Sequence, residues 1–172
     1  MRIQLANLED GGGRIAHVYA PGVLNLFDER VVLTGSASIS GKVRRSGGQV
    51  FVAGHIDAQA QVECDRCLRP VDLPVSTDFK VEYITDEDYK SSNVAELTEE
   101  EMALSVFDGE TIDIDEIVRE QVLLSIPARM LCQENCKGIC PNCGIDRNED
   151  ECGCETSDGD PRWSSLKKLA NK

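Results

Sequence analysis

The segment Leu131–Cys154, LCQENCKGICPNCGIDRNEDECGC, contains six of the eight cysteines of the chain. At its centre, the motif C-P-N-C-G at residues 140–144 has the form of a metal-binding knuckle. Two residues between the cysteines let both sulfurs face one ion, and the following glycine accepts a positive φ. A C-G-C motif at residues 152–154 supplies a second pair. We therefore predict one tetrahedral Zn²⁺ site, with sulfur–metal distances of ~2.3 Å, formed by Cys140, Cys143, Cys152 and Cys154.

The remaining four cysteines form a second candidate ligand set. Cys64 and Cys67 belong to a C-x-x-C motif far upstream, whereas Cys132 and Cys136 precede the knuckle. Two such pairs make an acceptable zinc site if the fold brings them together. A redox dithiol at the C-x-x-C motif and buried free thiols are the alternatives. The sequence leaves open whether the protein holds one metal or two, and whether that metal is zinc or iron.

The start of the chain and its cysteine content favour a cytoplasmic protein. The first residues, MRIQLANLEDGGGR, lack the apolar region of a signal peptide. No apolar run approaches the ~20 residues of a membrane-spanning helix. In the reducing cytosol that this implies, eight cysteines are more often metal ligands than disulfides.

The net charge of −13 is unevenly distributed. Residues 1–81 hold nine basic and nine acidic side chains, whereas residues 82–172 hold nine basic and 22 acidic ones. The second half should therefore repel a phosphate backbone, and a basic protein is the better partner for it. Solubility alone is the alternative explanation of the acidic excess.

Alternating apolar and polar residues predict three strands, at residues 31–44, 50–63 and 71–83. A Ser-Gly-Gly turn at residues 46–48 joins the first two, and the C-x-x-C motif lies at the turn between the second and third. Together they predict an antiparallel β-meander with two cysteines mounted on its second turn.

One main helix is predicted after this meander. Asp113 can cap its start, apolar residues follow at helical spacing, and Pro127 ends it. We expect this helix to cover the apolar face of the sheet and to bring Cys132 and Cys136 to the Cys64–Cys67 turn.

The predicted fold class is thus α+β, with two regions packed as one domain. Residues 1–130 form the β-rich part, and residues 131–172 form the cysteine-rich tail with a short terminal helix that starts at Asp160-Pro161. Smaller expectations are a strand at Ile3–Leu8, a surface loop at residues 86–101 and a hairpin around Asp108-Gly109.

Catalysis is not expected from this sequence. A closed four-cysteine site leaves no open coordination position. The chain also lacks a P-loop, G-x-G-x-x-G, H-E-x-x-H and G-x-S-x-G. We predict neither an enzyme nor a small-molecule substrate. The tail has few apolar side chains, so we expect its folding to depend on metal coordination, which contributes about 10–16 kcal/mol at a structural site.

Two groups of basic residues are candidates for RNA contact. Lys42, Arg44 and Arg45 lie near the first turn of the meander, and Arg66 and Arg69 lie at the C-x-x-C turn. Solvated charge on a sheet edge is the alternative explanation for the first group.

Several motifs combine into one pattern over most of the chain. They are C-x-R-C-L at residues 64–68, E-x-x-L-L-x-I-P at 120–127, G-I-C-P-x-C-G at 138–144, Asn148, C-x-C at 152–154, and D-P-R at 160–162 with Leu166 and Leu169. With these motifs the chain, from about Val31 to Leu169, resembles the bacterial YceD-like family of large ribosomal RNA subunit accumulation proteins.

This resemblance implies a cytoplasmic, non-enzymatic factor for the synthesis, processing or stability of large-subunit ribosomal RNA. Its expected partner is a large-subunit precursor or the ribosomal RNA itself. A protein-interaction or chaperone module for a basic ribosomal protein, without RNA contact, is the alternative. Some relatives lack the tail knuckle, which implies that the site at Cys140–Cys154 is an accessory to the one shared with them.

Overall fold

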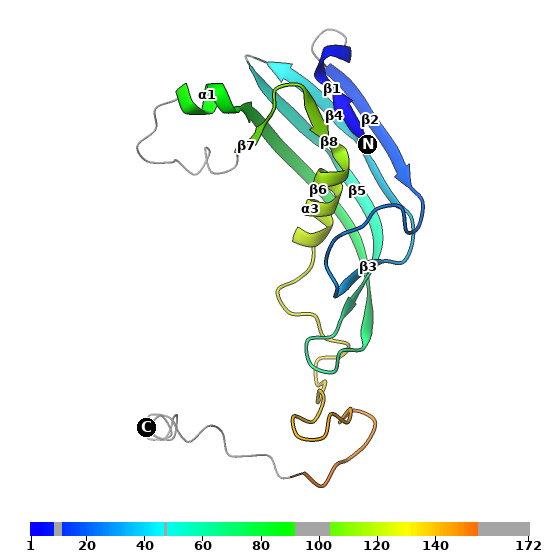
Figure 1. The fold of residues 1–172 in the computed structure, drawn as a ribbon. Coiled ribbons are helices and arrows are strands. Elements are labelled where there is room, and N and C mark those ends of the chain that lie inside the picture. Colours follow the sequence, from blue (N-terminus) through cyan, green and yellow to red (C-terminus); the bar gives the residue numbers. More distant parts are fainter. Residues whose placement is uncertain (9–11, 47, 92–103, 155–172) are drawn as a thin grey trace.

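The computed structural model describes residues 1–8, 12–46, 48–91 and 104–154 (Figure 1). These residues form mostly β-sheet with few helices, and two cysteine clusters lie near the C-terminal end of the described chain. This agrees with the predicted α+β class in outline. The terminal helix expected from Asp160 lies outside the described residues.

The main sheet contains six strands. Five of them follow the order β2-β4-β5-β6-β7, and β3 pairs with β5 beyond the end of β4. β7 is parallel to β6, and the other pairs are antiparallel. The strands are β2 (Gly12–Tyr19), β3 (Val31–Leu33), β4 (Ala37–Ser46), β5 (Gln49–Glu63), β6 (Pro70–Thr85) and β7 (Leu104–Phe107).

The predicted alternation of buried and exposed residues is present in β4, β5 and β6. Ile39 of β4 pairs with Ile56 of β5, and Val43 pairs with Val52. All four side chains are buried, whereas the residues between them face away from the core. Because side chains alternate across a pleated strand, this register places the apolar set on one face.

That meander is part of a larger sheet than the sequence predicts. The single strand expected at residues 31–44 is divided into β3 and β4. β2 joins one edge through an eight-residue register with β4, and β7 joins the other edge. Pairings between segments so distant in sequence depend on tertiary packing, which local periodicity does not encode.

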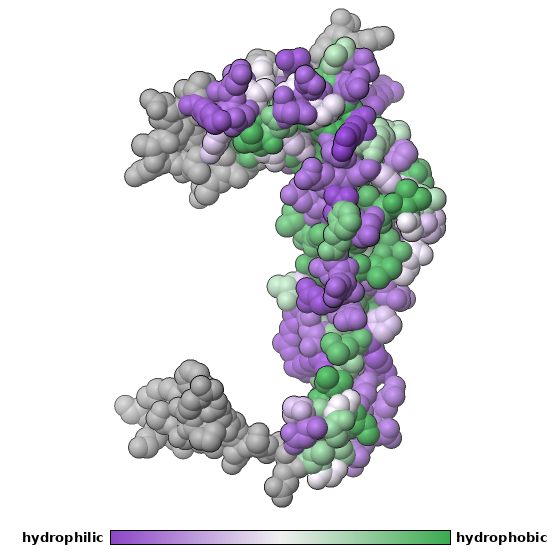
Figure 2. All heavy atoms as spheres, in the orientation of Figure 1, coloured by the Kyte–Doolittle hydropathy of each residue, from purple (hydrophilic) through white to green (hydrophobic). Residues whose placement is uncertain are grey.

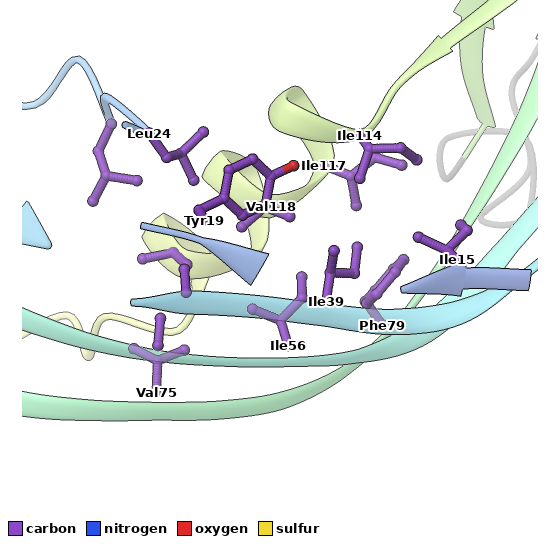
Figure 3. Packing of buried hydrophobic residues seen from close by; sticks show 14 of the residues in the cluster. Ile15, Tyr19, Leu24, Ile39, Ile56, Val75, Phe79, Ile114, Ile117 and Val118 are labelled. Atoms are coloured by element: carbon purple, nitrogen blue, oxygen red, sulfur yellow. The ribbon is translucent and has the colours of Figure 1, made fainter. Parts of the chain in front are cut away.

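The main helix, α3 (Ile114–Leu124), packs on the apolar face of the sheet (Figure 3). The Asp113 carboxylate accepts the backbone N–H of Asp115 at 3.0 Å, which confirms the predicted N-cap. The helix ends at Leu124, before Pro127. The helical residues with buried side chains are Ile114, Ile117, Val118 and Val122.

Three local predictions are wrong. The N-terminal strand is shorter than expected: β1 (Arg2–Gln4) is followed by the 3₁₀ turn η1 (Leu5–Asn7). The expected surface loop begins with a helix, α1 (Asp86–Ser91). β7 and β8 (Thr111–Asp113) do not form a hairpin, because β7 pairs with β6 and β8 pairs with β1.

The cysteine-rich segment lies at one end of the sheet, where β5 and β6 extend past α3 (Figure 1). In the space-filling view this end shows hydrophobic and hydrophilic side chains side by side (Figure 2). The last pair of this β5–β6 register is Glu63 with Pro70, directly beside the Cys64–Cys67 turn. The long hairpin therefore carries these two cysteines away from the hydrophobic core.

We predict that Ile117→Ala destabilises the protein, because Ile117 is fully buried between α3 and the sheet. The expected loss is about 2–5 kcal/mol in the free energy of unfolding, measured by urea denaturation of the metal-loaded protein. Leu124→Ala on the same helix is the matched control, since Leu124 is 74% exposed. Its expected effect lies within about 0.5 kcal/mol. Equal losses for both variants would contradict this packing of α3.

Candidate metal centres and the surrounding site

The first cysteine cluster joins the β5–β6 turn to the segment after α3. It consists of Cys64, Cys67, Cys132 and Cys136, whose sulfurs all lie within 4.8 Å of one another. The Cys64 and Cys136 sulfurs are 3.8 Å apart, and those of Cys67 and Cys132 are 3.6 Å apart. The edge of a sulfur tetrahedron around a metal is about 3.8 Å, as ~2.3 Å bonds require. The cluster therefore has metal-binding geometry, and its separations are much longer than a disulfide bond.

The second cluster consists of Cys140, Cys143, Cys152 and Cys154, again with all sulfurs within 4.8 Å of one another. Both predicted ligand sets are thus brought together as two groups that could hold a metal ion. The second is more open to solvent, because Cys143 is exposed and Cys152 and Cys154 are partly exposed. In the first cluster only Cys132 is more than slightly exposed.

The two knuckles share one backbone geometry. Leu68 follows the C-x-x-C motif with φ of 60°, and Gly144 follows the C-P-N-C motif with φ of 75°. Each donates its N–H to the carbonyl of the first cysteine, Cys64 or Cys140, at 2.9 Å. The two turns therefore have the same backbone hydrogen bond, even though only one of them has the expected glycine. Within each turn, backbone N–H groups also hydrogen-bond to the thiol of the first cysteine.

The first cluster is closed by hydrogen bonds around Asp65. Its backbone N–H donates to the Met130 carbonyl at 2.8 Å, and its carboxylate accepts the Met130 N–H at 2.6 Å. Two residues later, the Cys132 N–H donates to the Cys64 sulfur at 3.4 Å. These bonds set the position at which the chain leaving α3 meets the turn.

The thiols within each cluster differ in pKa. Burial opposes ionisation of Cys64, but backbone N–H groups, led by that of Cys67, hold its pKa at about 6. The backbone N–H of Cys143 makes the largest contribution to the similar pKa of about 6 at Cys140. Burial, followed by the hydrogen bond with Cys67, raises the pKa of Cys132 to about 12. A divalent cation would deprotonate the coordinating thiols and let all four ionise together.

Asn148 connects the two clusters. Its side-chain amide donates to the Cys136 sulfur at 3.4 Å, and its side-chain carbonyl accepts the Lys137 N–H at 2.8 Å. The residue belongs to the second knuckle, yet it contacts a ligand of the first. We did not predict a role for Asn148 from the sequence. The available signal was its position as a polar residue between the C-P-N-C and C-G-C motifs.

Arg66 and Arg69 also hold the clusters together. The Arg66 guanidinium donates to the Cys136 carbonyl at 2.6 Å, and the Arg66 carbonyl accepts the Ile139 N–H at 3.0 Å. Arg69 lies 3.1 Å from both Asp146 and Glu149. A hydrogen bond with Cys67 is the largest cause of the raised pKa of Arg69. Their positive charges offset part of the negative charge of four thiolates.

The two groups of basic residues that are candidates for RNA contact lie apart, and the sheet also divides the first group. Arg66 and Arg69 lie in the part of the molecule that contains both cysteine clusters, residues 64–69 and 130–154, which we call the metal end. Both side chains are engaged within the chain. Lys42 and Arg44 lie on the face of β4 that points away from α3, because they alternate with the buried Val43. Arg45 lies on the opposite face, beside Leu5 and Glu110. The sheet thus separates residues that are adjacent in sequence.

A polar cluster lies on the same face as Lys42, around His55. The imidazole Nδ1 is 2.7 Å from Asp78, and Nε2 is 3.1 Å from Ser76 and 3.3 Å from Asp57. The hydrogen bond with Asp78 is the largest cause of a raised His55 pKa, followed by that with Asp57. Within the described residues, this cluster is not among the groups with metal-binding spacing, which are the two cysteine sets.

The described helices contain no segment long and apolar enough to cross a membrane. The fold and the site define a class of protein: a β-sheet protein with two four-cysteine clusters at one end, the first of which joins the cysteine-rich segment to a long hairpin.

A sequence model of the family described as "Large ribosomal RNA subunit accumulation protein YceD" matches residues 52–170, which include all eight cysteines. This is more than half of the chain. The chain belongs to this family.

Similar proteins occur in bacteria and in a plant. An uncharacterised Mycobacterium bovis protein is 34% identical over 120 residues, which cover 70% of this chain and 55% of that protein. The uncharacterised protein YlbN of Bacillus subtilis is 28% identical over 157 residues, covering 83% of this chain and 86% of YlbN. An Arabidopsis thaliana protein named as a chloroplastic YCED homolog is 34% identical over 58 residues, covering 34% of this chain and 18% of that protein.

The chain spans about half the length of the mycobacterial relatives. Comparison with solved structures finds no match.

We predict an asymmetric dependence between the two centres. Cys143→Ser combined with Cys154→Ser should leave one bound metal per chain, because the first centre is anchored to the β5–β6 turn. Cys64→Ser combined with Cys67→Ser should lower the metal content below one, because the second centre loses the support of Cys136 and Arg66. Metal content of the purified proteins measures this, with circular dichroism as a control for the sheet. Independent loss of one metal in each variant would contradict the coupling.

We also predict that the pKa of His55 lies above 6.5 and falls toward that value in Asp78→Asn. The pKa of His55 is higher in the folded protein than in the unfolded chain. The contribution of the protonated imidazole to folding stability is therefore fully present below the unfolded-state pKa. It is lost as the pH rises through the folded-state pKa. NMR titration of the imidazole measures the pKa. His17→Gln assigns the signals, since the chain has only two histidines. An unchanged pKa in Asp78→Asn would rule out this contact.

Proposed function

We propose that this protein is a non-enzymatic, zinc-binding factor that supports the synthesis, processing or stability of large-subunit ribosomal RNA in the cytoplasm. Membership of the accumulation-protein family carries this proposal, together with the two linked four-cysteine centres. Its partner on this proposal is a large-subunit precursor.

Zinc is the proposed metal at both centres. All-cysteine sets with tetrahedral spacing are typical of structural zinc, and four protein ligands leave no open position for catalysis. Zinc would add a net positive charge of two to each set of four thiolates. On this proposal the metal holds the segment after Met130 against the β5–β6 turn and takes no part in a reaction.

The second candidate is a binding module or chaperone for a basic ribosomal protein, without RNA contact. The acidic excess of residues 82–172 favours it, because such a surface attracts a basic partner. Arg66 and Arg69 also give it support, since both are engaged within the metal end and are less available for phosphate.

Deletion of the gene in the cell that encodes this protein should lower the ratio of large-subunit to small-subunit ribosomal RNA. Wild-type protein and Leu124→Ala should restore this ratio. Cys136→Ser should not, because it removes a buried ligand of the first centre and the sulfur that Asn148 contacts. Quantitative RNA analysis of the complemented strains measures the outcome.

Elemental analysis of the same natively purified proteins tests the metal. We expect two zinc ions in the wild type and fewer in Cys136→Ser. Iron in the wild-type protein would refute the zinc assignment, whereas an unchanged RNA ratio after deletion would refute the proposed role.

A further inference from the structure

Three cations lie in one row across the sheet, on the face that points away from α3. Arg14 of β2 pairs with Lys42 of β4, Lys42 pairs with Ala53 of β5, and Ala53 pairs with Lys80 of β6. Directly paired residues of neighbouring strands project from the same face. With strands ~4.8 Å apart, Lys42 and Lys80 are separated by about 10 Å across the small Ala53 side chain.

These cations are available to a ligand. Arg14, Lys42 and Lys80 are all exposed, and among the described residues none of them takes part in an ion pair. In contrast, Arg66 and Arg69 are engaged at the metal end. The chain has a net charge of −13, so carboxylates that could pair with these cations are abundant. A row of three cations without ion pairs therefore requires an explanation.

The row borders an open hollow of about 850 Å³, whose lining includes Lys42, Ala53, His55 and Lys80. Gly41 and Gly54 face each other in register in the same lining. A Cβ at Gly41 would lie 2.4 Å from the Ala53 carbonyl oxygen, and one at Gly54 would lie 2.2 Å from that of Ser40. Only glycine permits this close approach of β4 and β5.

An aromatic ring lies one row further along the same face. Phe51 pairs with Arg44 and with Glu82, and the Arg44 guanidinium lies 5.8 Å from the centre of the Phe51 ring. Phe51 is half-buried although it faces away from the core. An aromatic ring and a guanidinium plane beside a row of cations are the two components of a surface that binds single-stranded nucleic acid.

The carboxylates on this face have polar or cationic neighbours. His55 binds Asp78 at 2.7 Å, and Ser76 donates to Asp57 at 2.8 Å. Glu82 is the acidic residue beside Phe51, against the cations Arg44 and Lys80 on the same face. The acidic surface beyond the patch is screened, because the Debye length is ≈ 8 Å at physiological ionic strength.

We propose that the face of the sheet opposite α3 binds a single-stranded segment of RNA, with phosphates on Arg14, Lys42 and Lys80 and a base against Phe51 and Arg44. The inference rests on the proposed role in large-subunit ribosomal RNA accumulation and assigns its RNA-binding surface. A single strand fits better than a duplex, because the face is open and shallow and stacking needs bases whose faces are exposed.

The test uses the full-length, metal-loaded protein and a fluorescently labelled single-stranded RNA of about 12 nucleotides, a length within the range of about 4–16 nucleotides that OB folds bind. Fluorescence anisotropy gives the affinity over a range of salt concentrations. Lys42→Gln and Lys80→Gln should each weaken binding several-fold and reduce the slope of log K against log salt by about 0.7. Phe51→Leu should weaken binding with little change in this slope, because it removes stacking and no charge.

Arg45→Gln is the matched control. It removes the same charge from the same strand, three residues from Lys42, but on the opposite face. It should leave both the affinity and the salt slope close to those of the wild type. Metal content and thermal unfolding are measured for each variant. Values close to those of the wild type exclude a folding defect as the cause of weaker RNA binding.

Equal losses in Lys42→Gln and Arg45→Gln would overturn the assignment of this face, as would duplex RNA that binds as tightly as the single strand. Wild-type protein without affinity for RNA would also overturn it, and the proposed role would then act through a protein partner. The cellular ratio of large-subunit to small-subunit ribosomal RNA tests that role separately, so failure of the surface and failure of the function are distinguishable.

Discussion

Ionised sulfurs repel one another at short range, and this protein collects eight cysteines into two groups with sulfurs no more than 4.8 Å apart. Backbone N–H groups lower the pKa of Cys64 and Cys140, whereas burial raises the pKa of Cys132. A bound divalent cation would resolve this conflict, because it would attract all four thiolates of a set. The same bonds would tie the segment after α3 to the β5–β6 turn, which the small number of apolar side chains there cannot do by burial.

The two centres are connected rather than merely adjacent. Asn148 of the second knuckle donates to the Cys136 sulfur. Arg69, which follows the C-x-x-C motif, lies beside Asp146 and Glu149 of the second knuckle. Surface ion pairs contribute little individually, about 0–1 kcal/mol, so the hydrogen bonds to buried ligands matter more for this connection. Contacts between side chains thus link the two clusters to each other and to the hairpin.

The cysteine clusters and α3 leave one face of the main sheet for a partner. Arg66 and Arg69 are used to assemble the metal end, and α3 covers the apolar face of the sheet. The opposite face keeps Arg14, Lys42 and Lys80 in a row without ion pairs among the described residues. A negatively charged protein can still present such a basic patch, because charge acts over about one Debye length in physiological salt.

Features that depend on local spacing could be predicted from the residues alone: the two cysteine sets, the alternation in the three central strands, and the Asp113 cap of the main helix. Which distant segments pair depends on the folded chain. It joined β2 to β4, separated β7 from β8, and directed Lys42 and Arg45 to opposite faces. It also assigned Arg66, Arg69 and Asn148 to the metal end. Periodicity records which side of an element is buried, but the identity of its neighbour depends on packing between residues far apart in the chain.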